Sequence, residues 1–208
     1  MKVLLLNGSC KVNGCTYTAL SEVAKVLEAN GISTEIFQIG ANPVRDCVAC
    51  GQCAGKYKCV FSDDAVNEFI EKAKDADGFV FGSPTYYAHA DGRVLCFLDR
   101  AFYAGKRYFA HKPAGVVAVA RRAGTTATID SLNKYPTIAE MPLVSSSYWN
   151  MAFGNKPEEI MRDEEGLQTM HNLGENMAWL LKCIEAGKNN GINVPETTSK
   201  IRTNFIKD

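Results

Sequence analysis

Short apolar runs alternate with longer amphipathic stretches along most of this chain. The segment "KVLLLNG" near the N-terminus is apolar at successive positions, as in a strand that is covered on both faces. The stretch that follows, residues 16–30, places Leu20, Val23 and Leu27 on one helical face. A repeated order of buried strand and amphipathic helix is typical of a parallel sheet with helices on both sides. We therefore predict an α/β fold, a doubly wound five-stranded parallel sheet in a three-layer sandwich.

The predicted elements form one domain. The third strand is expected to stop at Pro84, and Ser62 is the expected N-cap of the second helix. The domain is expected to span residues 1–187, with a cysteine-rich loop inserted at 46–60 and an irregular tail at 188–208. Strands are expected at residues 2–8, 33–40, 77–84, 114–120 and 141–147. Helices are expected at residues 16–30, 62–73, 92–103, 125–135 and 163–186.

Composition and charge narrow the class of partner. The chain has 208 residues, 46% of them hydrophobic, which is enough for one substantial core. It carries 23 Lys and Arg against 23 Asp and Glu, without a basic stripe for nucleic acid, so we expect a small-molecule partner. The apolar run from Val3 to Leu6 is too short for a signal peptide, and no run approaches membrane-spanning length. We expect a cytoplasmic protein that binds neither nucleic acid nor membranes.

The loops after the strands carry the signal for a ligand, because an open α/β sheet binds ligands beyond the carboxyl ends of its strands. The first loop, "NGSCKVNGCT", combines glycines with hydroxyl and amide side chains and one lysine. Ser9, Asn13 and Thr16 can donate hydrogen bonds, Lys11 adds charge, and free amides at the helix start favour an anion. The loop is suited to a phosphate, although an ordinary polar turn before a helix would have a similar composition.

Two later loops suggest the rest of that ligand. "GSPTYYAHADG" offers a rigid proline, a hydroxyl and flat rings, and "ARRAGTT" offers arginines beside a glycine. Three such loops after three strands indicate an extended ligand, with a phosphate at one end and a planar heterocycle at the other.

These motifs, in this order, resemble the NADPH-dependent FMN reductase branch of the flavodoxin-like superfamily. The likeness extends from Met1 to about Ala186 and implies a flavodoxin-like fold that binds FMN. It departs from the family pattern at Cys10, where proline is usual, and at Cys15, where asparagine is common. The resemblance implies phosphate contacts from Ser9, Lys11, Asn13, Cys15 and Thr16. It implies ring contacts from Pro84, Thr85, Tyr86 and Tyr87, and contacts to the pyrimidine edge from Arg121, Arg122 and Gly124.

Tyr148 and Trp149 follow the expected fifth strand. In the resembling family such a loop can lie near flavin, in some cases that of a neighbouring subunit, so Trp149 is a candidate flavin contact. Packing within the chain is the alternative. The resemblance also implies a homodimer or homotetramer.

The stretch "DCVACGQCAGKYKC" places Cys47, Cys50, Cys53 and Cys59 in one loop. Tightly spaced Cys-x-x-Cys-x-x-Cys runs are typical of [4Fe-4S] clusters, and this loop resembles that of the iron-sulfur flavoproteins in the same superfamily. Structural zinc sites usually use two cysteine or histidine pairs separated by a longer loop. A loop of reduced thiols without metal is the third interpretation, and the sequence leaves all three open.

We expect an FMN-dependent oxidoreductase that takes a hydride from NADH or NADPH at the flavin N5. The expected acceptors are a quinone, another flavin, a nitro or azo compound, or a redox partner. No side chain stands out as a catalytic acid or base, because the cofactor supplies the chemistry. The alternatives are a flavodoxin-type electron carrier without NAD(P)H activity of its own and a non-enzymatic metal-binding module.

Overall fold

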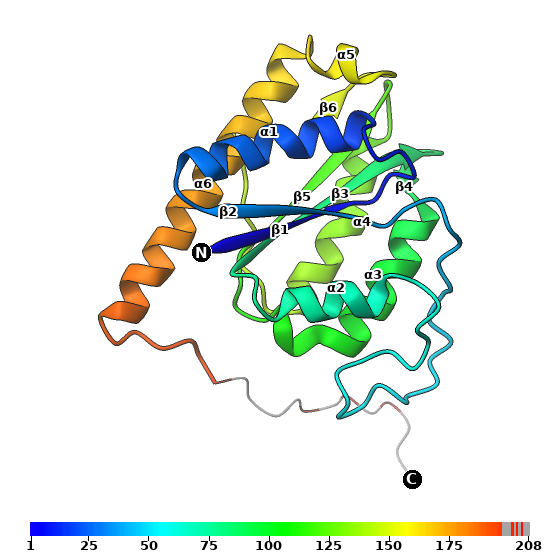
Figure 1. Cartoon of the computed structure of the whole chain (residues 1–208), viewed down its shortest axis with the longest axis vertical. Coiled ribbons are helices and arrows are strands. Elements are labelled where there is room, and N and C mark those ends of the chain that lie inside the picture. The colour runs from blue at the N-terminus through cyan, green and yellow to red at the C-terminus, as the bar shows by residue number, and fades with distance from the viewer. Residues whose placement is uncertain (197–200, 202, 204, 206–208) are drawn as a thin grey trace.

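The computed structural model describes residues 1–196, 201, 203 and 205, and one sheet organises it (Figure 1). Its central strands are β1 (Lys2–Asn7), β2 (Ser33–Gln38), β3 (Gly78–Tyr86), β5 (Ala114–Ala120) and β6 (Met151–Phe153). They are parallel and lie in the order β2-β1-β3-β5-β6. Because the order reverses at β1 and β3, the carboxyl ends of these two strands form the switch point at which such sheets bind ligands. The predicted doubly wound parallel sheet is confirmed.

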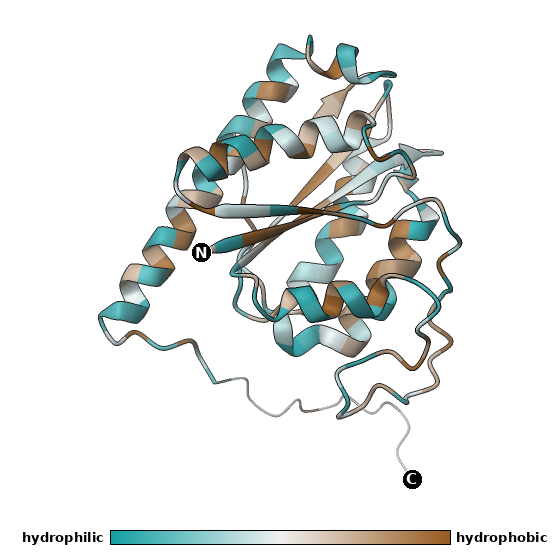
Figure 2. Cartoon of the chain, in the orientation of Figure 1, coloured by the Kyte–Doolittle hydropathy of each residue, from teal (hydrophilic) through white to brown (hydrophobic). Residues whose placement is uncertain are grey.

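Helices cover both faces of the sheet (Figure 1). One face carries α1 (Cys15–Ala29), α5 (Pro157–Ile160) and α6 (Glu164–Asn189). The other carries α2 (Val66–Ala73), α3 (Gly92–Gly105), the 3-10 turn Lys106–Tyr108 and α4 (Thr125–Ile138). Figure 2 shows apolar residues concentrated on the strands and on the helix faces that meet them. The result is the expected three-layer sandwich.

The core has two parts because side chains of a strand alternate between its faces. In β1, Val3 and Leu5 pack under α1 and α6, whereas Leu4 and Leu6 pack toward α2 and α3. The second part is rich in phenylalanine, and Phe102 and Phe109 stack with ring centroids 4.4 Å apart. Burial of one such ring contributes about 1.5–3 kcal/mol, so this cluster anchors α3 to the sheet.

Two strands differ from the prediction. The third strand continues through Pro84 to Tyr86 and turns back into β4 (His89–Ala90), which pairs with it antiparallel. The segment 141–147 forms only an isolated bridge, between Leu143 and Ala114, and the fifth strand of the main sheet is β6. The chain leaves the sheet at Ser145, whose carbonyl accepts a hydrogen bond from Asn176 of α6 at 2.8 Å. The start of β5, at Ala114, is thus bonded to this segment, whereas its last residues pair with β6.

Several helix boundaries also differ; α4, for example, ends at Ile138 instead of residue 135. The second helix begins at Val66 rather than after Ser62, because the Asp64 carboxylate accepts from the Val66 amide and also contacts Arg100. The last helix runs to Asn189, beyond the predicted domain boundary at residue 187. The predicted irregular tail therefore begins later, and part of it lies outside the described residues. Within the described part of the chain, no helix is long and apolar enough to cross a membrane.

Candidate functional site

Asn7, at the end of β1, shapes the loop that follows it. Its side chain is fully buried; Oδ1 accepts from the Ser9 amide at 3.1 Å, and Nδ2 donates to the carbonyls of Lys11 and Val12 at 3.4 and 3.3 Å. Gln38, at the end of the neighbouring strand β2, donates to the Ser9 carbonyl at 2.6 Å. The sequence analysis missed both residues as determinants of the loop, although a polar residue ending an apolar strand is a usable signal.

The loop packs closely against the sheet and connects β1 to the start of α1. A Cβ on Gly8 would lie 2.5 Å from the carbonyl oxygen of Gly82, so only glycine fits there. The N-cap of α1 is Gly14, no side chain caps the helix, and its first turn has no acidic residue. Unpaired amides and the positive end of the helix dipole therefore face the cleft, as a phosphate requires. Burial raises the pKa of the Cys15 thiol, which keeps this neighbour of the anion site uncharged.

The β3–β4 hairpin and the loop before α4 pack against each other. The hydroxyl oxygens of Thr85 and Thr128 lie 3.0 Å apart and share a hydrogen bond. The hairpin turns at Tyr87 and Ala88, which both have positive φ, 50° and 58°. Non-glycine residues with positive φ are strained, and such strain clusters at functional sites. The Tyr87 side chain is fully exposed at the tip of this hairpin.

An open cleft joins these loops at the carboxyl ends of β1, β3, β5 and β6. Gly154 and Asn155 were missed because the sequence pattern placed the fifth strand too early. The cleft is lined by Ser9, Lys11, Cys15, Thr16, Pro84, Thr85, Tyr86, Val119, Ala120, Arg121, Gly154 and Asn155. This lining contains two cations and no carboxylate, so it fits an anionic ligand with a flat uncharged part, such as FMN.

The remaining predicted flavin residues lie outside the lining of this cleft. Asn13 and Arg122 are exposed on its surrounding loops, and Gly124 supports the hairpin from behind. Trp149 precedes β6 instead of following the fifth strand, and it packs edge-on against Tyr148 with ring centroids 4.7 Å apart. These two rings and Ser145–Ser147 line a separate hollow at the sheet edge. The described chain therefore does not bring Trp149 together with the other candidate flavin contacts.

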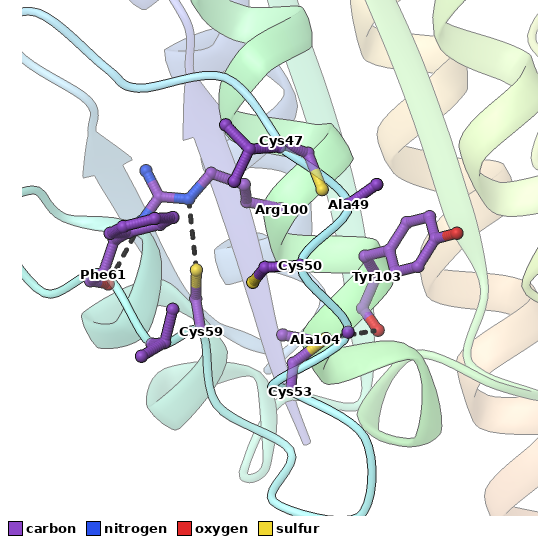
Figure 3. Close-up of a pocket in the computed structure, with 12 residues that line it drawn as sticks. Cys47, Ala49, Cys50, Cys53, Cys59, Phe61, Arg100, Tyr103 and Ala104 are labelled. Atoms are coloured by element: carbon purple, nitrogen blue, oxygen red, sulfur yellow. Dashed lines mark hydrogen bonds between the residues drawn. The ribbon is translucent and has the colours of Figure 1, made fainter.

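The cysteine loop brings its four thiols around one pocket beside α3 (Figure 3). Cys47, Cys50, Cys53 and Cys59 are all free, and their side chains share the lining with apolar groups such as Val48. The loop is fixed to the helix at two of the cysteines. Arg100 Nε donates to Cys59 Sγ at 3.3 Å, and Cys53 Sγ lies 4.0 Å from the Tyr103 carbonyl oxygen. The sequence analysis did not identify Arg100.

The backbone of this loop is also unusual. Ala49, Gly51, Gly55 and Tyr57 have positive φ, between 51° and 71°. From Cys47 to Cys53, no backbone amide donates to another residue within the described part of the chain. Successive turns of this kind can direct free amides toward an anion, as in many iron-sulfur sites.

The four thiols can be compared with what each kind of metal site requires. Among the described residues, no three Cys, His, Asp or Glu side chains converge on the position of a single metal ion. Zinc needs such convergence, with sulfurs about 2.3 Å from one ion. A four-iron cluster instead takes one thiolate at each of four separated irons. The four thiols line one pocket, which makes this pocket the candidate site for such a cluster.

Comparisons with known proteins agree with this geometry. An iron-sulfur flavoprotein of Methanocaldococcus jannaschii is 30% identical over 89% of this chain and 100% of its own length. An iron-sulfur flavoprotein of Methanosarcina thermophila is 26% identical over 90% and 99%. An FMN-dependent NADPH-azoreductase of Staphylococcus saprophyticus is 32% identical over 56% and 59%.

Solved structures show the same fold. A flavone reductase matches with a TM-score of 0.68 at 20% identity, over 89% of this chain and 64% of that one. A flavodoxin from the domain Archaea matches with a TM-score of 0.59 at 15% identity, over 88% and 99%. The expected flavodoxin-like fold is thus confirmed. The sequence profile described as NADPH-dependent FMN reductase matches residues 1–156, so the chain belongs to the NADPH-dependent FMN reductase family.

Proposed function

We propose that this protein is a cytoplasmic FMN-dependent oxidoreductase that accepts electrons from NADPH or NADH and passes them to a separate acceptor. The observation that carries the proposal is the cleft, which combines the free N-terminus of α1 with the wall formed by Pro84, Thr85 and Tyr86. One end suits a phosphate, and the other suits a planar ring. Membership of the FMN reductase family supports FMN and NADPH as the molecules used there.

The residues of the cleft divide between phosphate and ring. Bound FMN would supply hydride and electron transfer, and the protein would bind and orient it. Burial raises the pKa of Tyr86, so its hydroxyl stays protonated at neutral pH and can donate a hydrogen bond. Ser9, Lys11, Asn13, Cys15 and Thr16 would hold the phosphate. Arg121, Arg122 and Gly124 would approach the pyrimidine edge, and Tyr87 is proposed as an outer contact. Trp149 is proposed as a contact to the flavin of a neighbouring subunit.

We further propose that Cys47, Cys50, Cys53 and Cys59 hold a [4Fe-4S] cluster. Support comes from the shared pocket of the thiols, from the free amides of the loop, and from relatives named iron-sulfur flavoproteins that align over most of this chain. A cluster in the same protein as a flavin would let the protein exchange single electrons. The proposed acceptor is then a redox protein, whereas a metal-free loop would favour a quinone, a flavin, or a nitro or azo compound.

A flavodoxin-type electron carrier is the second candidate. It is supported by the fold shared with the archaeal flavodoxin and by a cleft that would hold FMN in either candidate. Such a carrier would bind FMN and a cluster but would not react with NADPH or NADH itself. The proposed homodimer or homotetramer concerns both candidates and can be measured by light scattering.

The test is anaerobic purification followed by an absorption spectrum, iron and acid-labile sulfide analysis, and addition of each nicotinamide. We expect flavin bands, about four irons per chain, and bleaching of the flavin by NADPH or NADH. Flavin without iron would refute the proposed cluster. Zinc in a one-to-one ratio to the chain would show that the four cysteines bind zinc instead. Flavin that neither nicotinamide bleaches would refute the reductase and favour the carrier. A colourless protein would refute both and favour a metal-binding module.

A further inference from the structure

Arg100 of α3 is buried beneath the cysteine loop. It is 2% exposed and contacts the carboxylate of Asp64, whose side chain is 5% exposed. Arginine is almost never fully buried without a partner, because desolvation of its charge is costly. The ion pair does not line the proposed FMN cleft. The buried ion pair of Arg100 and Asp64 instead lies under the cysteine loop, so its role concerns that loop.

The guanidinium of Arg100 holds the two ends of the cysteine loop together. Nη1 donates to the Arg45 carbonyl at 3.2 Å, just before the first cysteine, and Nη2 donates to the Phe61 carbonyl at 3.1 Å, just after the last. Asp64, on the same exit segment, completes the contact. A planar group with five fixed N–H donors can serve several acceptors at once, which lysine cannot do.

The same guanidinium reaches one of the four thiols. Its Nε donates to Cys59 Sγ at 3.3 Å. Figure 3 draws this hydrogen bond beside the one from the same guanidinium to the Phe61 carbonyl. Cys59 is therefore the thiol whose sulfur is fixed by a charged donor from outside the loop. Hydrogen bonds to the sulfurs of a cluster and the charge around it are among the factors that set its reduction potential.

We propose that Arg100 is the positioning residue of the cysteine loop, and that its hydrogen bond to Cys59 raises the reduction potential of the cluster bound there. This inference rests on the proposed cluster. Reduction adds one negative charge, which a nearby cation and an N–H donor stabilise. Asp64 opposes this effect because its carboxylate offsets the charge of Arg100.

The test measures the cluster potential, by titration followed with electron paramagnetic resonance, in anaerobically purified Arg100→Lys and Asp64→Asn variants. Arg100→Lys keeps the charge but loses the donor to Cys59, and a hydrogen bond to a charged group is worth about a factor of ten or more. We expect the ratio of reduced to oxidised cluster at fixed potential to fall about tenfold, equivalent to about 59 mV for one electron. In Asp64→Asn we expect the potential to rise.

Opposite shifts from the two partners separate tuning from damage to the fold, which would move both variants in the same direction. The matched control is Arg45→Lys, whose side chain pairs with Asp63 at the loop surface while its carbonyl still accepts from Arg100. We expect its potential to equal that of the wild type. Unchanged potentials in Arg100→Lys and Asp64→Asn would overturn the proposal. If Arg100→Lys loses its iron, the cluster potential of Asp64→Asn becomes the test. An unchanged potential in Asp64→Asn would then overturn the proposal.

A second measurement needs no cluster. In protein freed of iron by a chelator, we expect exchange of the hydrogen-bonded amides in residues 54–59 to be faster in Arg100→Lys than in Arg45→Lys. Equal exchange would overturn the positioning role. If the wild type contains no iron after anaerobic purification, the cluster and its tuning fail together, while the exchange comparison still tests whether Arg100 positions the loop.

Discussion

A Cβ atom on Gly124 would lie 2.3 Å from the Cα atom of Ala88, so the loop before α4 and the tip of the β3–β4 hairpin are packed in direct contact. Gly124 also has a φ of 92°, which favours glycine. In Gly124→Ala the hairpin must shift, and with it the wall at Tyr86. We expect at least a tenfold rise in the dissociation constant for FMN, measured by fluorescence titration, and a lower melting temperature.

Gly31→Ala is the control for that substitution. Gly31 also has a positive φ, 78°, but a Cβ added there would meet no atom within 4 Å. Gly31→Ala therefore measures only the cost of placing alanine at positive φ, about 1 kcal/mol. FMN affinity in this control should equal that of the wild type. Wild-type affinity in Gly124→Ala as well would contradict the role of this contact.

Lys11 should contribute charge to phosphate binding. We expect Lys11→Met to weaken FMN binding about five- to tenfold at low salt and to leave riboflavin binding unchanged, since riboflavin has no phosphate. The difference should shrink at about 1 M salt, where the screening length is about 3 Å. Lys25→Met, on the helix that follows this loop but outside the cleft, is the control. Equal losses for FMN and riboflavin would argue against a phosphate at this loop.

Tyr87 combines a strained backbone with an exposed ring. Asparagine tolerates positive φ far better, so Tyr87→Asn should stabilise the flavin-free protein, with about 2–4 °C in melting temperature for each kcal/mol in a chain of this size. FMN should bind more weakly, because the ring is lost. Tyr87→Phe keeps both strain and ring and should change neither property. Tighter FMN binding in Tyr87→Asn would show that the ring does not contact flavin.

Cys53 and Cys96 provide a matched pair for the cluster. Cys53 lines the thiol pocket, whereas Cys96 lies on α3 outside it and its pKa is raised by burial. We expect Cys53→Ser to lose most of its iron and acid-labile sulfide but to keep FMN. Cys96→Ser should keep both. Equal iron in the two variants would show that iron is bound elsewhere.

Glu35 ties β2 to β1 and α2. It accepts hydrogen bonds from Lys2 at 2.6 Å and from Lys72 at 2.8 Å, and these bonds lower its pKa below the ordinary 4.5. Its carboxylate therefore stabilises the folded state above that value, and the contribution is lost as the pH falls through the lowered pKa. We expect Glu35→Gln to lower the free energy of unfolding by about 0.5–1 kcal/mol at neutral pH.

That difference should shrink between neutral pH and an acidic pH below the lowered pKa of Glu35, because the wild-type carboxyl becomes protonated there. Urea unfolding at both pH values measures it, and Glu22→Gln, in an exposed pair within α1, is the control. If Glu35→Gln remained equally less stable than the wild type at low pH, the loss of unfolding free energy would come from packing instead of charge.

Much of the fold follows from local patterns. The apolar run of β5 was predicted with its observed bounds, Ala114–Ala120, and the start of α3 at Gly92 was also predicted. The loop proposed to bind phosphate was singled out because its glycines and polar side chains stand directly between a strand and a helix, and it does join β1 to α1. Each of these signals lies within a few neighbouring residues, so no distant contact is needed to recognise it.

The errors arise where distant residues compete for the chain. The chain leaves the sheet after Leu143, where the Ser145 carbonyl accepts from Asn176 of α6, and the last strand begins at Met151 with Trp149 before it. Asp64 contacts Arg100, which lies on another helix, and α2 begins at Val66 instead of after Ser62. Neither contact can be predicted from the hydrophobic periodicity of the segments involved.

Periodicity and spacing along the chain were enough to establish the parallel α/β architecture, the order of the ligand-binding loops and the grouping of four thiols, because these signals act over short separations. Which side chains meet became visible only in three dimensions. Folding places Gln38 on the phosphate loop, Gly124 behind Ala88 and Arg100 on Cys59. These contacts depend on how strands and helices pack against one another, and packing follows shape and charge in space rather than order along the chain.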